Sequence, residues 1–295
     1  MFFELSKSKD VNEKRALSYF YLPSYPENFH EYYGNKNGFL RRLNRKEMMY
    51  SLSDGIKLDN GGVIIQIVEM GGIYIIFIAF AIISWLISNQ LKVKFAKYSK
   101  MPIQYSGKEI AERMLRQNGI DDVKVLSVEG QLTDHYNPAN KTVNLSRDVY
   151  YGSNVAAAAV AAHETGHAVQ HASAYAWLQM RSALVPVVSF ASRWVQWVLL
   201  AGILVVNTFP QLLVAGIILF ASTTFFSIIT LPVEVNASHR ALVWLKGTGI
   251  TNNQNQAAAF DALKWAAYTY FIAALASLAT LVYYVLILMG ARNRD

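Results

Sequence analysis

Four long runs without charge constrain the fold of this chain more than any other feature. They cover residues 70–88, 194–209, 212–231 and 265–289. The first run is close to the roughly 20 apolar residues that cross a bilayer core. One such run also fits a buried core helix, but four of them in 295 residues favour membrane insertion. The sequence therefore predicts an α-helical membrane protein with about four transmembrane helices, in which Pro210 joins the second and third as a tight pair.

Composition and charge placement agree with a membrane protein. Hydrophobic residues make up 53% of the chain, which exceeds the share in a typical soluble domain. The net charge is +7 at pH 7, but the basic residues lie mainly in the first sixty residues and beside the apolar runs. That placement suits the flanks of membrane spans better than a nucleic-acid groove. We therefore expect a lipid bilayer as a partner and no nucleic acid.

Two further kinds of feature are not found in the sequence. The chain has no cysteine, which excludes disulfides and any zinc site built on cysteine. Its first thirty residues contain no continuous apolar segment, so we expect no cleavable signal peptide.

The polar parts of the chain divide into three segments. Residues 1–62 form an extension without clear periodicity, to which no chemistry is assigned. Residues 101–183 predict a small folded domain, and residues 232–264 link the third and fourth runs. In the domain, a capping box at Ser106 and Glu109 predicts a helix that ends at Asn118. Strands are expected at 123–128, 132–136 and 142–145, followed by a helix from Val155 through Trp177.

The helix predicted from Val155 carries the sequence His163-Glu164-Thr165-Gly166-His167. Two histidines at i and i+4 lie on one helix face and can bind one metal ion. The carboxylate of Glu164 lies beside the first histidine and can take a proton from a metal-bound water. An ordinary helix can carry this motif by chance, but an H-E-x-x-H pattern is typical of a zinc hydrolase.

A catalytic zinc site needs a third protein ligand and an open position. His171 follows one turn after His167, but three ligands at i, i+4 and i+8 of one straight helix do not converge easily on a tetrahedral ion. Glu234 is the better candidate because it is the only glutamate after Glu164. Two predicted spans separate it from His167, so the chain returns to the membrane face of the zinc helix.

These motifs resemble bacterial membrane zinc metallopeptidases of the YugP-like family, also called zinc peptidase family 2. The resemblance covers about residues 70–290 and also rests on segments 132–136, 149–152, 163–171 and 232–240. That family is distantly similar to HtpX-type membrane gluzincins, in which the glutamate ligand lies in E-x-x-A-D. Here Ser238 occupies the position of that aspartate, so Ser238 or Asn236 would have to orient a ligand histidine.

The resemblance implies a fold and a set of roles. It implies a small α+β gluzincin-like protease domain that binds one zinc ion through His163, His167 and Glu234, with Glu164 as general base. Arg240 or His239 would stabilise the oxyanion. An edge strand would align a protein or peptide substrate by backbone hydrogen bonds. That strand would contain Leu132, Thr133, Asp134, His135 and Tyr136.

The distribution of basic residues predicts the orientation in the membrane. Basic side chains are more numerous on the catalytic side of the spans, and cytoplasmic loops carry such an excess. We therefore expect an integral protein of a bacterial cell membrane with its catalytic domain in the cytoplasm and both termini outside. The residues on the catalytic side are Lys92, Lys94, Lys97, Lys100, Lys108, Arg181, Arg240, Lys246 and Lys264, and those opposite are Arg45, Lys46, Lys57, Arg292 and Arg294.

Two alternatives to a surface endopeptidase remain open at this point. One is an intramembrane protease of the site-2 type, but the aspartate segment that such enzymes use, L-D-G or N-P-D-G, does not occur in the chain. The other is a membrane scaffold with a structural zinc, against which the intact Glu164 argues. The sequence leaves the oligomeric state open.

Overall fold

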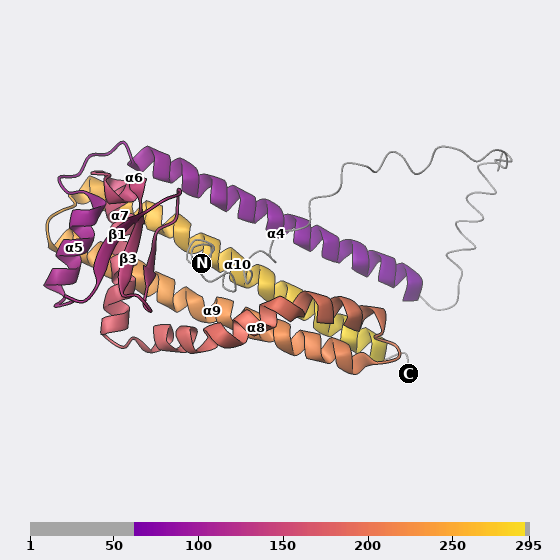
Figure 1. Ribbon diagram of the computed structural model, residues 1–295. Helices are drawn as coiled ribbons and strands as arrows, with labels where there is room; N and C mark the ends of the chain where they lie inside the picture. Colours follow the sequence, from indigo (N-terminus) through magenta and orange to yellow (C-terminus); the bar gives the residue numbers. More distant parts are fainter. Residues whose placement is uncertain (1–61, 293–295) are drawn as a thin grey trace, which may run out of the picture. The chain divides into compact units, whose positions relative to one another are not determined.

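The computed structural model describes residues 62–292 of the chain (Figure 1). The extension predicted for residues 1–62 therefore lies outside the described residues, except for Gly62. Within the described part, four helices are long and apolar enough to cross a membrane. These segments are Ile75–Tyr98, Ala176–Leu204, Pro210–Gly247 and Asn253–Ala291. The predicted fold class is confirmed: the protein is a helical membrane protein with a small α+β domain.

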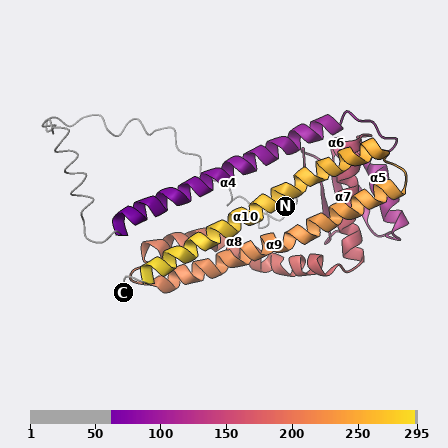
Figure 2. The same cartoon turned by 180° about the vertical axis from the view of Figure 1, so that it is seen from behind.

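Three of the long helices form a bundle. Helices α8 (Ala176–Leu204), α9 (Pro210–Gly247) and α10 (Asn253–Arg292) follow one another, and α9 packs against both of its neighbours (Figures 1 and 2). Glycines let α8 and α9 approach closely at the end where they are joined. A Cβ atom on Gly202 would lie 2.6 Å from the Cα atom of Leu213, and one on Gly216 would lie 2.8 Å from a side-chain carbon of Leu199.

The helix that precedes the small domain is joined to α10 by polar contacts. Helix α4 (Gly62–Tyr98) ends in Lys94 and Tyr98, which both contact the same carboxylate. The Asp261 Oδ2 atom lies 2.8 Å from the Lys94 Nζ atom and accepts a hydrogen bond of 2.6 Å from the Tyr98 hydroxyl. These contacts fix the carboxyl end of α4 next to the beginning of α10.

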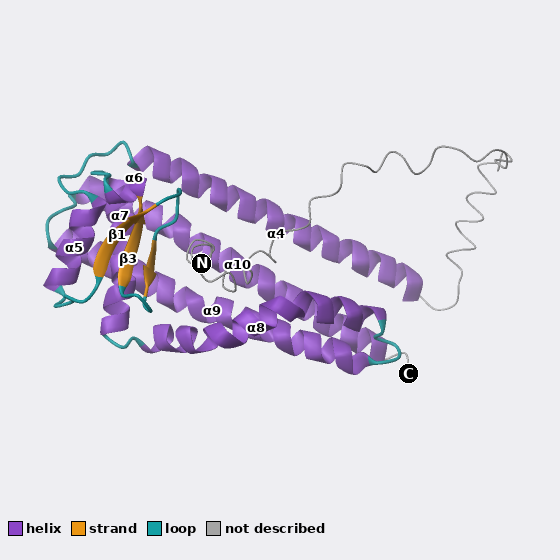
Figure 3. Ribbon diagram, in the orientation of Figure 1, coloured by secondary structure: helices purple, strands orange, loops and turns teal. Residues whose placement is uncertain are grey.

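The small domain consists of a three-stranded sheet and three helices. Its elements are α5 (Gly107–Gln117), β1 (Lys124–Val128), β2 (His135–Asn137), β3 (Thr142–Ser146), α6 (Arg147–Tyr150) and α7 (Val155–Ala172). The strand order is β1-β3-β2, with β1 parallel and β2 antiparallel to β3 (Figure 3). Helix α5 begins at the predicted capping box, in which Ser106 and Glu109 exchange hydrogen bonds.

Helix α7 lies at the centre of the small domain. Its amino end is capped by the Asn154 side chain, which accepts a hydrogen bond from the Ala157 N–H. The alanine-rich first half is buried, and the helix packs against α5, α9 and α10. The prediction that this helix continues through Trp177 is wrong. It ends at Ala172, because Ala174 has a positive φ of 50° that no α-helix accommodates.

The second strand also differs from the prediction. A strand was expected at 132–136, but β2 begins only at His135. Leu132 has a positive φ of 55°, which breaks the extended backbone. The Asp134 carboxylate is buried and accepts hydrogen bonds from the Ser146 N–H and hydroxyl, at 2.6 and 3.2 Å. The segment before β2 is therefore a loop that is fastened to the end of β3, and β2 itself is an edge strand.

Candidate metal centre

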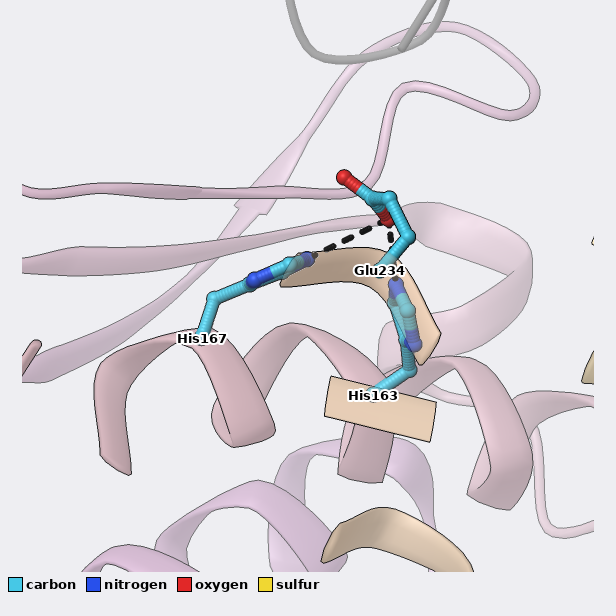
Figure 4. A group of neighbouring side chains, drawn as sticks. All are labelled: His163, His167 and Glu234. Carbon is cyan, nitrogen blue, oxygen red and sulfur yellow. Dashed lines mark ion pairs between the residues drawn. The ribbon is translucent and has the colours of Figure 1, made fainter. Parts of the chain in front are cut away.

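Two helices bring three ligand-type side chains together. Helix α7 carries His163 and His167 one turn apart, and Glu234 of α9 lies over both imidazole rings (Figure 4). Because α9 is one continuous helix, Glu234 lies well inside it and not at the start of a separate polar segment. Among the described residues, these three form the group that could hold a metal ion, with ligand atoms within 4.8 Å of one another.

The distances suit a tetrahedral ion. The Glu234 Oε2 atom lies 3.3 Å from His163 Nε2 and 3.6 Å from His167 Nε2. Zinc binds histidine nitrogen and carboxylate oxygen at about 2.0–2.2 Å, so two ligand atoms of a tetrahedral site lie about 3.3–3.5 Å apart. Two of the three separations therefore already match those of a tetrahedral site, and all three ligand atoms lie within 4.8 Å of one another.

The burial of Glu234 points the same way. Only 1% of this residue is exposed, and within the described part of the chain neither carboxylate oxygen accepts a hydrogen bond. A buried carboxylate without such partners is costly unless it is paired or binds a metal. The donor set of two imidazoles and one carboxylate matches that of catalytic zinc sites.

The second nitrogen of each histidine also has a partner. His163 Nδ1 lies 3.1 Å from the Ser238 hydroxyl, and His167 Nδ1 lies 2.9 Å from Gln170 Oε1. Ser238 or Asn236 was expected to orient a ligand histidine. Ser238 makes such a contact, whereas the Asn236 Oδ1 atom accepts hydrogen bonds from Gln170 and Arg240. Sequence reasoning missed Gln170, although its place three residues after His167 puts it on the neighbouring part of the same helix face.

Glu164 lies between the metal group and the edge strand. Its side chain is largely buried, and its Oε2 atom accepts a hydrogen bond of 3.1 Å from the Tyr136 backbone N–H. This contact joins β2 directly to the carboxylate next to His163, and no sequence pattern predicted it. A buried carboxylate held by a backbone donor is well suited to a repeated proton transfer.

The remaining residues of segment 132–136 make contacts within the domain. Thr133 donates from its hydroxyl to the backbone of the preceding turn, and its carbonyl lies 3.0 Å from His135 Nδ1. The Tyr136 hydroxyl lies 2.7 Å from His171 Nδ1. Burial raises the pKa of the Tyr136 hydroxyl to about 12, so this group stays protonated at neutral pH. His171 does not belong to the group of three ligand atoms.

The two residues expected to stabilise an oxyanion lie further along α9. His239 is exposed, and Arg240 donates from Nε to Asn236 Oδ1 at 2.8 Å. The Arg240 guanidinium also lies over the Tyr175 ring, 5.9 Å from its centroid. These contacts hold Arg240 next to the short link between α7 and α8.

Comparisons with known proteins give the family. Residues 73–289 match the family described as "Putative neutral zinc metallopeptidase". The chain is 42% identical over 224 residues to the Bacillus subtilis (strain 168) protein named "Putative membrane protease YugP", a match that covers 75% of this chain and 99% of that protein. No solved structure matches the chain. The chain therefore belongs to this family of zinc metallopeptidases, as its motifs indicated.

Proposed function

We propose that this member of the zinc metallopeptidase family is a membrane-anchored endopeptidase that binds one zinc ion and hydrolyses peptide bonds at the membrane surface. The convergence of His163, His167 and the buried Glu234 next to the Glu164 carboxylate carries the proposal. A structural zinc site has no need of a further carboxylate beside its ligands. A zinc ion held by these three ligands would keep a coordination position open for water, as in catalytic zinc sites.

The residues of the chain have separate tasks in this proposal. A zinc ion held by the three ligands would lower the pKa of a water molecule and polarise the scissile carbonyl. Glu164 accepts the proton of the attacking water and passes it to the leaving amine. The Tyr136 N–H holds the Glu164 carboxylate in place during both transfers. Arg240 and His239 are the proposed sources of charge for the oxyanion.

The edge strand is the proposed guide for the substrate backbone. Strand β2 pairs with β3 on one side only, and its Tyr136 N–H faces Glu164. A peptide that adds to the open side of β2 would therefore pass directly beside the general base. This arrangement fits an extended segment of a protein or peptide substrate.

The position of Glu234 along α9 favours a site at the membrane surface over one inside the bilayer. Helix α9 begins at Pro210, and Glu234 follows 24 residues later. At about 1.5 Å per residue this is a distance of about 36 Å. The hydrocarbon core is about 30 Å thick, so an upright α9 that enters at Pro210 would carry Glu234 beyond it. The excess of basic residues on this side places the site in the cytoplasm in our proposal.

Metal content and one substitution test the function. Purified protein should contain about one zinc per chain and cleave an unfolded protein. Glu164→Gln should keep the zinc and lose about two or more decades of rate, because the base is removed. Glu112→Gln on the exposed face of α5 is the matched control and should behave as wild type. Unchanged rate in Glu164→Gln would contradict the mechanism, and zinc without any proteolysis by the wild type would favour a membrane scaffold.

A further inference from the structure

The Gln170 side chain is completely buried between the two helices that carry the metal ligands. Its Oε1 atom lies 2.9 Å from His167 Nδ1 on its own helix α7. Its Nε2 atom lies 2.8 Å from the Val233 carbonyl oxygen and 3.0 Å from Asn236 Oδ1, both on α9. One amide group therefore connects His167 to α9 on both sides of Glu234, at Val233 and at Asn236.

The donor and the acceptor of each hydrogen bond around Gln170 can be assigned from two groups whose roles are fixed. The Val233 carbonyl can only accept, and the Arg240 guanidinium can only donate. Arg240 Nε lies 2.8 Å from Asn236 Oδ1, which must therefore be an oxygen that accepts. The Gln170 NH2 group must face these two acceptors, which leaves the Gln170 oxygen for His167.

This polarity determines which nitrogen of His167 carries a hydrogen. An amide oxygen accepts only, so His167 Nδ1 must donate to Gln170 Oε1. In the neutral imidazole the lone pair is then on Nε2, the nitrogen that lies 3.6 Å from Glu234 Oε2. The hydrogen-bond chain thus holds His167 in the one neutral form that binds a metal from the side of Glu234.

We propose that Gln170 is the positioning residue of the metal centre, which sets both the protonated nitrogen of His167 and the spacing between α7 and α9. This inference rests on the zinc site of the proposed function. Asn236 and Arg240 affect His167 only indirectly, because they hold the Gln170 amide in the required orientation. None of the Gln170 side chain is exposed, so bulk water cannot replace these protein partners.

The other histidine is held differently. His163 Nδ1 lies 3.1 Å from the Ser238 hydroxyl, which can donate or accept. Ser238 therefore accommodates either neutral form of His163 and imposes neither. Loss of the partner of His167 should consequently weaken metal binding more than loss of the partner of His163.

Binding of cobalt and zinc to the metal-free full-length protein in detergent tests this. Gln170→Leu should bind both ions about 10–100-fold more weakly than wild type, measured by competition with a chelator. The visible spectrum of bound cobalt should change as well, because the orientation of His167 is no longer fixed. Ser238→Ala should show a smaller loss, and Gln179→Leu on the exposed part of α8 should show none.

A second substitution separates positioning from packing. Gln170→Glu keeps an oxygen for His167 but turns a carboxylate towards the Val233 carbonyl and Asn236 Oδ1. It should bind metal more weakly than wild type even though its size is almost unchanged.

Thermal unfolding of the metal-free variants shows whether a loss of metal binding results only from a loss of folded structure. If Gln170→Leu does not fold, Asn236→Leu takes its place and should weaken binding several-fold.

The outcomes distinguish this inference from the proposed function. Wild-type affinity and an unchanged cobalt spectrum in Gln170→Leu, or in Asn236→Leu where that variant replaces it, would overturn the role of Gln170 and leave the zinc site standing. A larger loss in Ser238→Ala than in Gln170→Leu would also overturn it. Failure of the wild type to bind either ion would overturn the metal site itself, and the role of Gln170 with it.

Discussion

Replacement of Gly166 by alanine should disrupt the metal centre through a single methyl group. Gly166 lies between Glu164 and His167 on α7, where the backbone of α9 lies against it. A Cβ atom on Gly166 would lie 2.8 Å from the Ala237 carbonyl oxygen and 3.3 Å from its Cα atom. The obstacle is backbone, so no flexible side chain can move aside.

The size of the effect follows from these distances. Ordinary van der Waals contact requires about 3.5 Å, so α9 must move away by roughly 0.7 Å. Glu234 lies three residues before Ala237 and would move with it. Catalytic groups have to stay within about 0.5 Å of their productive positions, and a displacement of about 1 Å can cost 100-fold in rate. We therefore expect about 10–100-fold lower kcat/KM and weaker zinc binding.

The expected change in stability is smaller than the change in activity. Overpacking costs about 1–3 kcal/mol, but alanine is favoured over glycine in a helix by about 1 kcal/mol. The free energy of unfolding should therefore fall by only about 0–2 kcal/mol. Gly247→Ala at the end of α9 is the matched control, because a Cβ atom there meets nothing within 4 Å.

Three measurements on the same preparations decide this prediction. They are zinc affinity by chelator competition, cleavage of an unfolded protein, and thermal unfolding in detergent. Gly166→Ala should lose affinity and activity while it remains folded, and Gly247→Ala should lose neither. Wild-type zinc affinity and activity in Gly166→Ala would refute the close contact between α7 and α9 as the basis of the site.

Three further predictions concern the ligands, the pH dependence and the orientation. His163→Ala and Glu234→Ala should each strongly lower the zinc content, and full zinc and activity in Glu234→Ala would disprove the third ligand. Burial and the nearby Asp122 raise the pKa of Tyr136 to about 12, above the value of about 10 in an unfolded chain. Between these values only the folded chain keeps the proton, so the free energy of unfolding should fall as the pH rises from 10 to 12, and Tyr136→Phe should reduce this slope in thermal unfolding. A reporter after Asp295 should behave as extracytoplasmic and a tag within residues 100–130 as cytoplasmic, and the reverse pattern would overturn the orientation.

The length of apolar runs and the spacing of residues made the larger features of the fold predictable. Apolar runs of bilayer length identified the spans, and the i and i+4 spacing placed His163 and His167 on one helix face. The candidate third ligand was also chosen from the sequence alone, because two spans return the chain to the same side and Glu234 is the only glutamate after Glu164. These inferences depend on periodicity and on counting, which need no knowledge of side-chain contacts.

The features that were missed depend on contacts between distant residues. Positive φ angles at Ala174 and Leu132 end α7 at Ala172 and delay the start of β2. Alanine and leucine are not typical turn residues, so the sequence did not indicate these breaks. The role of Gln170 results from the Val233 carbonyl, 63 residues away on α9. No local pattern contains such a contact, so the sequence indicated the candidate ligands but not the groups that contact them.

A membrane helix supplies part of the candidate metal centre, because Glu234 belongs to α9. Glu234 reaches His163 and His167 because α9 packs directly against α7, and α9 also packs closely against α8, where Gly202 lies against the backbone of Leu213. A fragment limited to residues 101–183 would contain both histidines and Glu164 but would lack the third ligand and the acceptors for Gln170. The proposed zinc site therefore requires that the small domain and the bundle are assembled together, because only then are all three candidate ligands present.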